Sequence, residues 1–468
     1  MRGTTLVAVA VIAVCSTGQA QDASEKWRIH EWGTFTSLQD EYGRSIGWIN
    51  TEDEPVPEFV HRLRKSLLVP IDDLAPAFDK GAPRAHPDVL VRLETPVLYF
   101  HPPKNAKLPT SIDIKVDFRG GWLTEFYPNG KVTAPGLDQR TADFGRLGPK
   151  TIGSLEWKGL LVGKDGEFPA TRDSVWLAPR DVKAAPITTA DQKECERFIF
   201  YRGVAYLQAP LSAVRTNDGK KIAIYGRLPE EMGRVGALKI PRMWFVDIRE
   251  NGDIAFRTLP ATTITSAAGR ELATVDSTFS ENDYSSGNFT NLRREMKEGL
   301  ISEGLYADEA DALLNTWEAS YFQSHGLRIF FMVPRAWTEH VLPLKASIPA
   351  EVTRAMIGRL ELVTPAQRAC LKRIMEAKEC STAWYYEWLE KHPEAAKRFQ
   401  QRRREGDLQS LRKDCVKIPD DYLAYLELGR FRNSIVLDSY RLGKAALRKF
   451  IETYDLAPAN VPERRSGE

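Results

Sequence analysis

The sequence predicts an α+β protein with an antiparallel, β-rich, sandwich-like N-terminal half and a mostly helical C-terminal half. From about residue 88 to residue 258, short runs of apolar and polar residues alternate. Dipeptides typical of tight hairpin turns separate these runs: Asn129-Gly130, Asp165-Gly166, Asp218-Gly219 and Asn251-Gly252. After residue 280 the apolar residues recur at helical spacing instead, as in Ala310, Leu313, Leu314, Trp317 and Tyr321.

The first twenty residues have the pattern of a secretory signal, because Arg2 precedes a nine-residue apolar run at 6–14 and Ala20 is a small residue suited to cleavage. The run is too short to span a bilayer. Cys15 suggests an alternative, a lipid-modified N-terminus, but the bulky Val14 before it argues against that. We therefore expect an exported protein, periplasmic or extracellular, with no transmembrane segment beyond the signal.

After the signal at 1–20, we expect a β-rich domain at 21–279, a helical domain with two strands at 280–455, and a polar tail at 456–468. The boundary is a stretch rich in Ser, Asn and Gly at 280–291. The two strands are predicted at 327–333 and 356–363, and we expect them to join a sheet. A chain of this length exceeds what one hydrophobic core usually organises.

Composition excludes several classes of protein. The 65 basic and 63 acidic side chains almost cancel, so the chain lacks the global positive field of a nucleic-acid-binding protein. It has no H-E-x-x-H, no G-x-G-x-x-G and no Walker loop, which argues against a zincin, a dinucleotide-binding enzyme and a P-loop NTPase. No cofactor and no oligomeric state is specified by the sequence.

The segment at 27–37 combines a histidine, a carboxylate and two tryptophans at the start of the mature chain. As a strand it presents alternate residues to opposite faces, so His30 and Glu31 point in opposite directions. Glu31 falls on an otherwise apolar face, where a carboxylate has to be paired, hydrogen-bonded or protonated. Two interpretations stay open for Glu31: a buried structural ion pair, or a catalytic or ligand-binding carboxylate.

Histidines concentrate in the first part of the chain, where His30, His61, His86 and His101 occur among only seven in total. One hypothesis is a hydrolase that uses His30 or His101 with Glu31 or Glu94, the carboxylate serving as general base or metal ligand. His30 and His101 are the candidate metal ligands, although the spacing matches no known metal module. The alternative is that these histidines are packing residues.

Binding residues are predicted at two further places. Arg335, Glu339 and His340 directly follow the predicted strand at 327–333, but Arg335 and Glu339 also have the i, i+4 spacing of an ordinary surface ion pair. Trp32 could stack on a sugar ring, and Arg202 lies in the aromatic strand predicted at 196–204. The alternative for the tryptophans is burial in the core, which aromatic residues usually favour.

Four cysteines remain after cleavage of the signal: Cys195, Cys370, Cys380 and Cys415. An even number in an exported chain is compatible with two disulfides. On a continuous helix Cys370 and Cys380 are too far apart to bond. We expect a Cys380–Cys415 disulfide that closes a helical hairpin.

Four phrases, at 30–37, 93–100, 197–204 and 326–344, resemble those of a group of exported bacterial proteins that share an HEWGTFTS-type N-terminal segment. The resemblance covers most of the mature chain. It implies one long pair of domains and brings no catalytic residues, since that group has no assigned activity.

Three functions therefore stay open. The first is a non-catalytic binding or scaffold protein of the cell envelope, with a glycan or an envelope component as its partner and no role for nucleic acid. The second is the hydrolase described above. The third is a purely structural protein.

Overall fold

The computed structural model describes residues 26–50, 56–63, 86–136, 146–228, 236–265, 269–377, 380–393, 418–454 and 456, with the backbone of 78–79 and 82–83. The predicted signal with Cys15, the tail from residue 457 onward and Cys415 lie outside these residues. Within the described part, no helix has both the length and the apolar character needed to cross a membrane.

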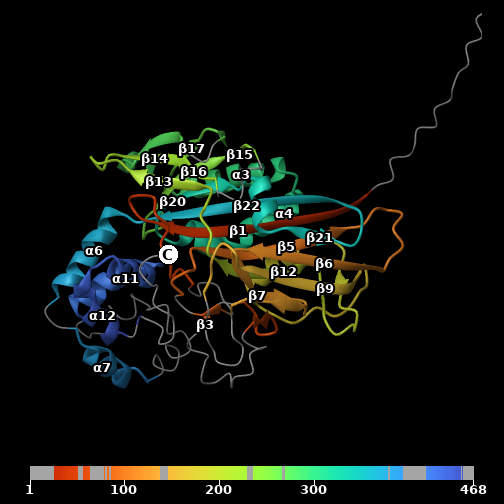
Figure 1. Cartoon of the computed structure of the whole chain (residues 1–468), viewed down its shortest axis with the longest axis horizontal. Helices are drawn as coiled ribbons and strands as arrows, with labels where there is room; N and C mark the ends of the chain where they lie inside the picture. Colours follow the sequence, from red (N-terminus) through yellow and green to blue (C-terminus); the bar gives the residue numbers. More distant parts are fainter. Residues whose placement is uncertain are drawn as a thin grey trace, which may run out of the picture.

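The molecule is an α+β protein built around strand β1 (Trp27–Gln39), as the sequence predicts. On one side β1 pairs with β5 (Val91–His101) in antiparallel fashion. On the other side it pairs in parallel with β22 (Ala350–Leu362), which lies more than three hundred residues later in the chain. The strands of the C-terminal half therefore join the main sheet, as expected (Figure 1).

The main sheet runs in the order β11-β10-β9-β7-β12-β5-β1-β22-β20-β16-β17. Its remaining members on this path are β7 (Gly121–Tyr127), β9 (Ile152–Val162), β10 (Ile187–Thr188), β11 (Cys195–Glu196), β12 (Ile199–Ala205), β16 (Met243–Ile248), β17 (Ile254–Leu259) and β20 (Gly326–Met332). Four strands branch from it: β2 (His61–Arg62), β6 (Thr110–Arg119), β8 (Lys131–Thr133) and β21 (Leu344–Ala346). Smaller sheets contain β13 (Leu211–Arg215), β14 (Lys221–Gly226) and β19 (Glu271–Asp276); β15 (Leu238–Ile240) and β18 (Thr262–Ile264); and β3 (Phe78–Asp79) and β4 (Ala82–Pro83).

Two of the predicted hairpins are confirmed and one is wrong. Asp218-Gly219 joins β13 to β14, and Asn251-Gly252 joins β16 to β17, with both glycines at positive φ. The segment after Asn129-Gly130 does not return along β7, because β8 pairs with β9 instead. A turn dipeptide predicts a change of direction, but tertiary packing decides which neighbour the next strand meets.

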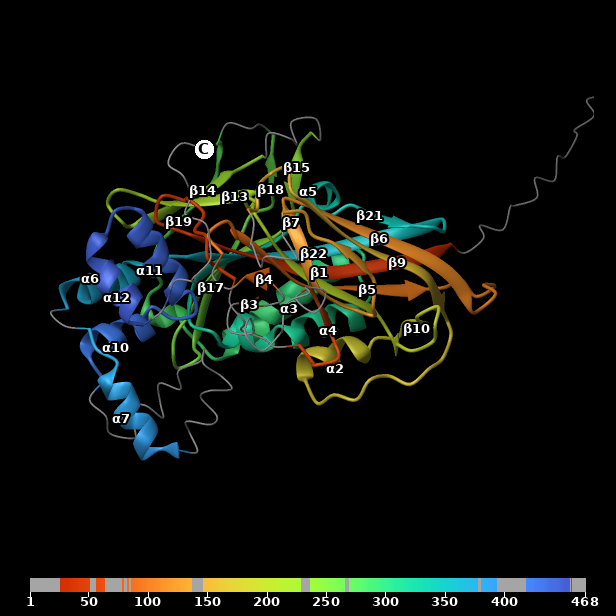
Figure 2. The same cartoon turned by 60° about the horizontal axis from the view of Figure 1, so that its bottom comes forward.

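The helices cover one face and one end of the main sheet. Helices α2 (Ser174–Arg180), α3 (Gly287–Ser302) and α4 (Ala307–Thr316) lie together on one face, and α6 (Pro365–Glu376), α10 (Asp420–Glu427), α11 (Arg432–Arg441) and α12 (Arg448–Thr453) gather at one end (Figure 2). The others are α5 (Arg335–Val341), α7 (Ala383–Lys391) and the short η4 (Glu281–Asp283), η5 (Ala319–Gln323) and η6 (Ala445–Leu447). A glycine just past a helix predicts its end, and α3 ends before Gly304, which has a positive φ. A threonine followed by proline predicts a helix start, and α6 begins at Thr364-Pro365.

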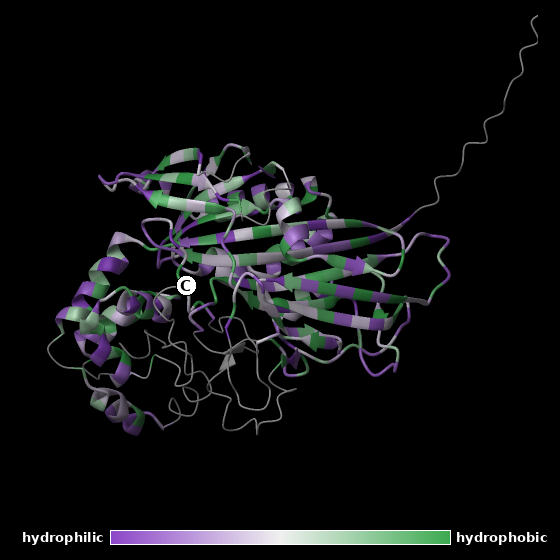
Figure 3. Ribbon diagram, in the orientation of Figure 1, coloured by the Kyte–Doolittle hydropathy of each residue, from purple (hydrophilic) through white to green (hydrophobic). Residues whose placement is uncertain are grey.

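The two faces of β1 enter different cores, because its side chains alternate. Ile29 and Phe35 join a core that β6 and β9 also fill, so the sheet curls over this face like a sandwich. Trp32 joins a second core with side chains of α3 and α4, and Leu38 joins a third core with the C-terminal helices. The strands accordingly alternate between apolar and polar residues along their length (Figure 3).

Strict alternation from the sequence predicts Leu93 and Val97 on one face of β5 and Leu98 on the other, and this prediction is wrong beyond the middle of the strand. Thr95 has a positive φ of 49°, and the register with β1 shifts between Trp32 and Thr34. Leu93 therefore shares a core with Leu98, and not with Val97 as strict alternation would require. A bulge adds one residue and reverses the alternation.

Candidate metal centre

His30 and His101 come together at one end of the β1–β5 pair, although 71 positions separate them in the chain. In the antiparallel register Tyr99 lies opposite His30 and His101 lies opposite Arg28, so the two histidines are diagonal neighbours. Their ring centroids are 4.9 Å apart. The strand pairing thus brings together the two residues that the sequence offers as metal ligands.

Glu309 completes the group from the first turn of α4. Its Oε2 lies 2.8 Å from Nδ1 of His30, and its Oε1 lies 2.9 Å from Nε2 of His101. The same carboxylate accepts the backbone N–H of Tyr306 at 2.7 Å, as in a capping box. One carboxylate therefore both starts the helix and holds the two imidazoles.

The three side chains form a compact and largely enclosed set of donors. The donor atoms of His30, His101 and Glu309 all lie within 4.8 Å of one another. The side chains of His30 and Glu309 are 3% and 0% exposed, whereas that of His101 is 13% exposed and gives access from solvent. The ring of Tyr306 packs on both imidazoles, with centroid distances of 4.6 and 4.9 Å.

Glu309 and Tyr306 are not among the site residues that the sequence predicts. Both belong to the segment Tyr306-Ala307-Asp308-Glu309, whose Glu at the third helical position is a recognisable sign of a helix start. That pattern predicts a cap and gives no indication that the carboxylate reaches a histidine of β1. The contact depends on how α4 packs against the sheet.

Glu309 has a pKa below its usual value. Burial acts to raise this pKa, but the hydrogen bonds from His101 and His30, the charge of His30 and the backbone N–H of Tyr306 together lower it. Because the folded pKa lies below the unfolded one, the ionised carboxylate stabilises the fold above the ordinary value of 4.5, and this contribution disappears as pH falls through the folded pKa.

We therefore expect the stability difference between the metal-free wild type and Glu309→Gln to shrink as the pH is lowered below 4.5. Urea unfolding of both proteins from pH 6 to pH 3, with chelator present, measures this difference. A difference in the free energy of unfolding that stays constant over that range would contradict a stabilising role of the ionised Glu309.

Glu31 points to the opposite face, as the strand alternation predicts. It accepts a hydrogen bond from the Tyr201 hydroxyl and pairs with the buried guanidinium of Arg354. Burial, followed by the charge of Glu31, raises the pKa of Tyr201 well above its usual value, so the phenol stays a donor. Of the two interpretations of Glu31, this arrangement matches the buried structural ion pair. Glu31 and His30 lie on opposite faces of the sheet.

Glu94 lies beside Thr34 in the β1–β5 register, four residues along β1 from His30. At about 3.3 Å per residue this is about 13 Å. Thr36 Oγ1 donates to Glu94 at 2.6 Å, and Arg92 pairs with it at 2.8 Å. The structure therefore brings His30 and His101 together but places neither Glu31 nor Glu94 beside them.

The predicted binding residues lie at separate places. Trp32 is fully buried against Tyr99 and offers no surface for stacking on a sugar. Arg202 is buried and pairs with Glu125. Arg335 is about half exposed and pairs with Glu339 at 2.7 Å, the surface ion pair that its spacing allows.

His340 lies 3.2 Å from Arg119, a neighbour on β6 that the sequence does not indicate. Cys195, Cys370 and Cys380 are free thiols, and the described part of the chain contains no disulfide. Cys415, the expected partner of Cys380, lies outside the described residues.

Residues 43–47, Gly-Arg-Ser-Ile-Gly, match the G-x-S-x-G spacing of a hydrolase nucleophile elbow. That motif needs a turn from a strand into a helix. Here the chain forms no helix from Ser45 to the end of the described stretch at Asn50, and the Ser45 hydroxyl donates to Gln208 at 2.7 Å. The match therefore lacks the structural context of a catalytic serine.

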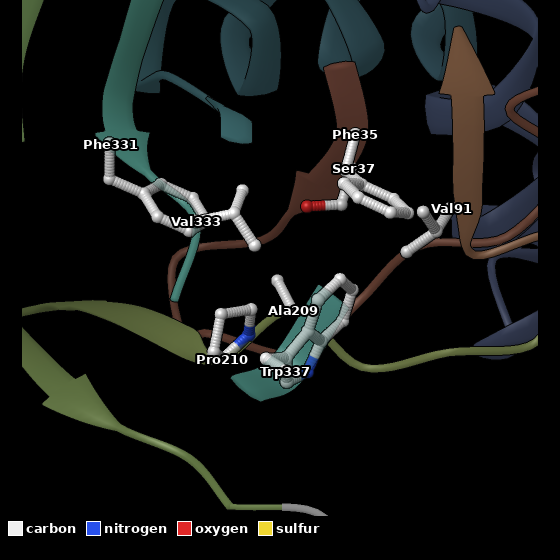
Figure 4. Close-up of a pocket in the computed structure, with 8 residues that line it drawn as sticks. All are labelled: Phe35, Ser37, Val91, Ala209, Pro210, Phe331, Val333 and Trp337. Carbon is white, nitrogen blue, oxygen red and sulfur yellow. The ribbon is translucent and has the colours of Figure 1, made fainter. Parts of the chain in front are cut away.

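A small hollow on the other face of the sheet is lined by Phe35, Ser37, Val91, Ala209, Pro210, Phe331, Val333 and Trp337 (Figure 4). Among the described residues that line it, Ser37 and the Trp337 indole are the only polar side chains, and none is titratable. It has the character of a gap in packing. The histidine–glutamate group is the stronger candidate for chemistry.

No protein-family model matches the chain, and no curated protein matches it in sequence. Among solved structures, the chain is similar to the yeast delta-COP-I mu-homology domain, with 10% identity, 72% of this chain and 98% of that chain covered, and a TM-score of 0.25. It is also similar to the Fcho1 mu homology domain of Danio rerio with a bound Eps15 peptide. The identity is 9%, 72% of this chain and 97% of that chain are covered, and the TM-score is 0.27. Similarity this low assigns neither a family nor an activity.

Proposed function

We propose that this chain is an exported metal-binding protein of the cell envelope that holds one divalent transition-metal ion between His30, His101 and Glu309. One observation carries the proposal: two imidazole nitrogens and a carboxylate, from three elements distant in sequence, lie within 4.8 Å of one another. The signal-like N-terminus supports export.

The donor set fits zinc, which takes imidazole nitrogen and carboxylate oxygen at about 2 Å. Ligand atoms of a tetrahedral site then lie about 3.3 Å apart. His30 and His101 already meet Glu309 at 2.8 and 2.9 Å, so small rotations of the side chains suffice. Binding a metal would replace the ring protons that now face the carboxylate, and affinity would fall in acid.

Zinc titration of the mature protein, freed of metal by chelation, tests the proposal. We expect one equivalent of zinc to bind to wild type. In Glu309→Gln the zinc affinity should fall about 100-fold or more, because even substitution of a residue that only hydrogen-bonds to a metal ligand lowers metal affinity about 10- to 100-fold. Glu351→Gln is the matched control, because Glu351 is an exposed carboxylate beside Arg28. Wild type that binds no zinc, cobalt or nickel would refute the proposal.

A metal-dependent hydrolase is the second candidate function. Three protein ligands leave a position for water on a zinc ion, and the partly exposed His101 provides access to it. The zinc-loaded and metal-free proteins from the same titration serve to test it. Ester or phosphoester hydrolysis that appears only with zinc, and is lost in Glu309→Gln, would support this function.

A further inference from the structure

Tyr306, the residue directly before α4, contacts every member of the candidate metal centre. Its ring centroid lies 4.6 Å from that of His30 and 4.9 Å from that of His101. Its backbone N–H donates to Oε2 of Glu309 at 2.7 Å. The proposed ligands come from β1, β5 and α4, and Tyr306 joins all three of these elements.

The three aromatic rings are packed at steep angles to one another. The ring of Tyr306 is tilted by 53° to that of His30 and by 74° to that of His101. The two imidazoles are tilted by 59° to each other at 4.9 Å. Aromatic rings favour tilted or edge-on contacts at such separations, and these contacts stabilise beyond the area that they bury. A rotation of either imidazole would therefore disturb its contact with Tyr306.

The orientation of the imidazoles matters because a histidine binds a metal ion only when a ring nitrogen points at it, and neighbouring groups fix that orientation. Without metal, Glu309 holds the rings through Nδ1 of His30 at 2.8 Å and Nε2 of His101 at 2.9 Å. A metal ion between the three donors would take over these contacts. The packing of Tyr306 against the rings uses none of the donor atoms, so it would persist in the metal-bound protein.

Tyr306 also lies on the outer side of the metal centre. It is 38% exposed, whereas the side chains of His30 and Glu309 are almost completely buried. Its hydroxyl accepts a hydrogen bond from Nη1 of Arg28 at 3.1 Å. Because Arg28 lies opposite His101 in the register of β1 and β5, this bond ties the ring to the sheet beside the two histidines.

We infer that Tyr306 is a positioning residue of the metal centre: its ring holds the imidazoles of His30 and His101 in the orientation that binds a metal ion, and it slows release of the ion. The inference rests on the proposed metal binding and adds a residue that is not itself a ligand. The aromatic ring supplies the effect, and the hydrogen bond from Arg28 restrains the ring.

Zinc affinity, together with the rate of zinc transfer to a chelator, tests the inference in wild type and Tyr306→Ala. In Tyr306→Ala the zinc affinity should fall about 10- to 100-fold, the range found when a group that orients a metal ligand is removed. Zinc transfer should become faster, because the ring no longer covers the outer side. Tyr306→Phe keeps the ring and should stay within about threefold of wild type, since one exposed hydrogen bond contributes little.

Cobalt-loaded proteins separate positioning of the ligands from a general effect on the fold. The visible absorption of cobalt depends on its coordination geometry, so the spectrum should change in Tyr306→Ala and return to that of wild type in Tyr306→Phe. Tyr306→Leu keeps an apolar side chain without a ring and should also weaken zinc binding, which provides the test if Tyr306→Ala does not fold. Tyr386→Ala is the matched control, because it removes an exposed tyrosine of α7 and should leave zinc affinity unchanged.

The possible results distinguish this inference from the proposed function. Zinc affinity in Tyr306→Ala and Tyr306→Leu that equals wild type would overturn the inference and leave the metal centre in place. An equal loss of affinity in Tyr306→Phe and Tyr306→Ala would also overturn it, because the ring would then not supply the effect. Wild type that binds no zinc, cobalt or nickel would refute the metal centre itself, and the inference with it.

Discussion

Glu31→Gln is expected to lower the free energy of unfolding by about 3–5 kcal/mol, because it leaves the Arg354 guanidinium buried without its counter-charge. Glu31 is fully buried and Arg354 almost so. The pKa of Arg354 reflects this pairing: burial acts to lower it, but the charge of Glu31 and the hydrogen bond raise it above its usual value. Gln keeps the shape of the side chain and removes only the charge.

Urea unfolding at neutral pH measures this loss, with Glu351→Gln as the control. Glu351 also faces an arginine, Arg28, but both side chains are at least half exposed. Exposed pairs contribute about 0–1 kcal/mol, so the control should stay close to wild type. A loss below about 1 kcal/mol in Glu31→Gln would show that the buried pair does not stabilise the fold in this way.

His30→Ala is expected to weaken zinc binding by about 100-fold or more, even though His30 is the direct neighbour of Glu31. Its Nδ1 lies against Glu309, and no other described residue of β1 belongs to the metal-ligand group. Glu31→Gln should bind zinc like wild type wherever it remains folded, because Glu31 lies on the other face of the sheet. Substitutions of these two adjacent residues would then have different effects: His30→Ala would weaken zinc binding, and Glu31→Gln would lower stability.

His61→Ala is the matched control for this experiment. His61 pairs with Glu194 at 2.6 Å, so this substitution also removes an imidazole from a carboxylate. Among the described residues, the pair does not belong to a cluster of metal-binding side chains. Zinc affinity that falls equally in His30→Ala and His61→Ala would indicate surface binding and contradict the proposed centre. Isothermal titration with zinc measures the zinc affinity of both variants, and the metal content after dialysis provides a check.

Local sequence patterns determined the elements themselves. The alternation along 27–37 predicted a strand that separates His30 from Glu31, and the turn dipeptides predicted the β13–β14 and β16–β17 hairpins. Thr364-Pro365 predicted the start of α6. These features depend on side-chain periodicity, φ preferences and capping, which act over a few residues.

Only the tertiary structure decided which of these elements meet. Glu309 reaches His30 across 279 positions because α4 packs on the sheet beside β1. The bulge at Thr95 changed the faces of β5, and the parallel pairing of β1 with β22 brought Arg359 close enough to Glu94 for their charges to interact. A strand's sequence specifies its two faces, whereas its neighbours are selected by the packing of the whole chain, and the candidate metal centre consists of such neighbours.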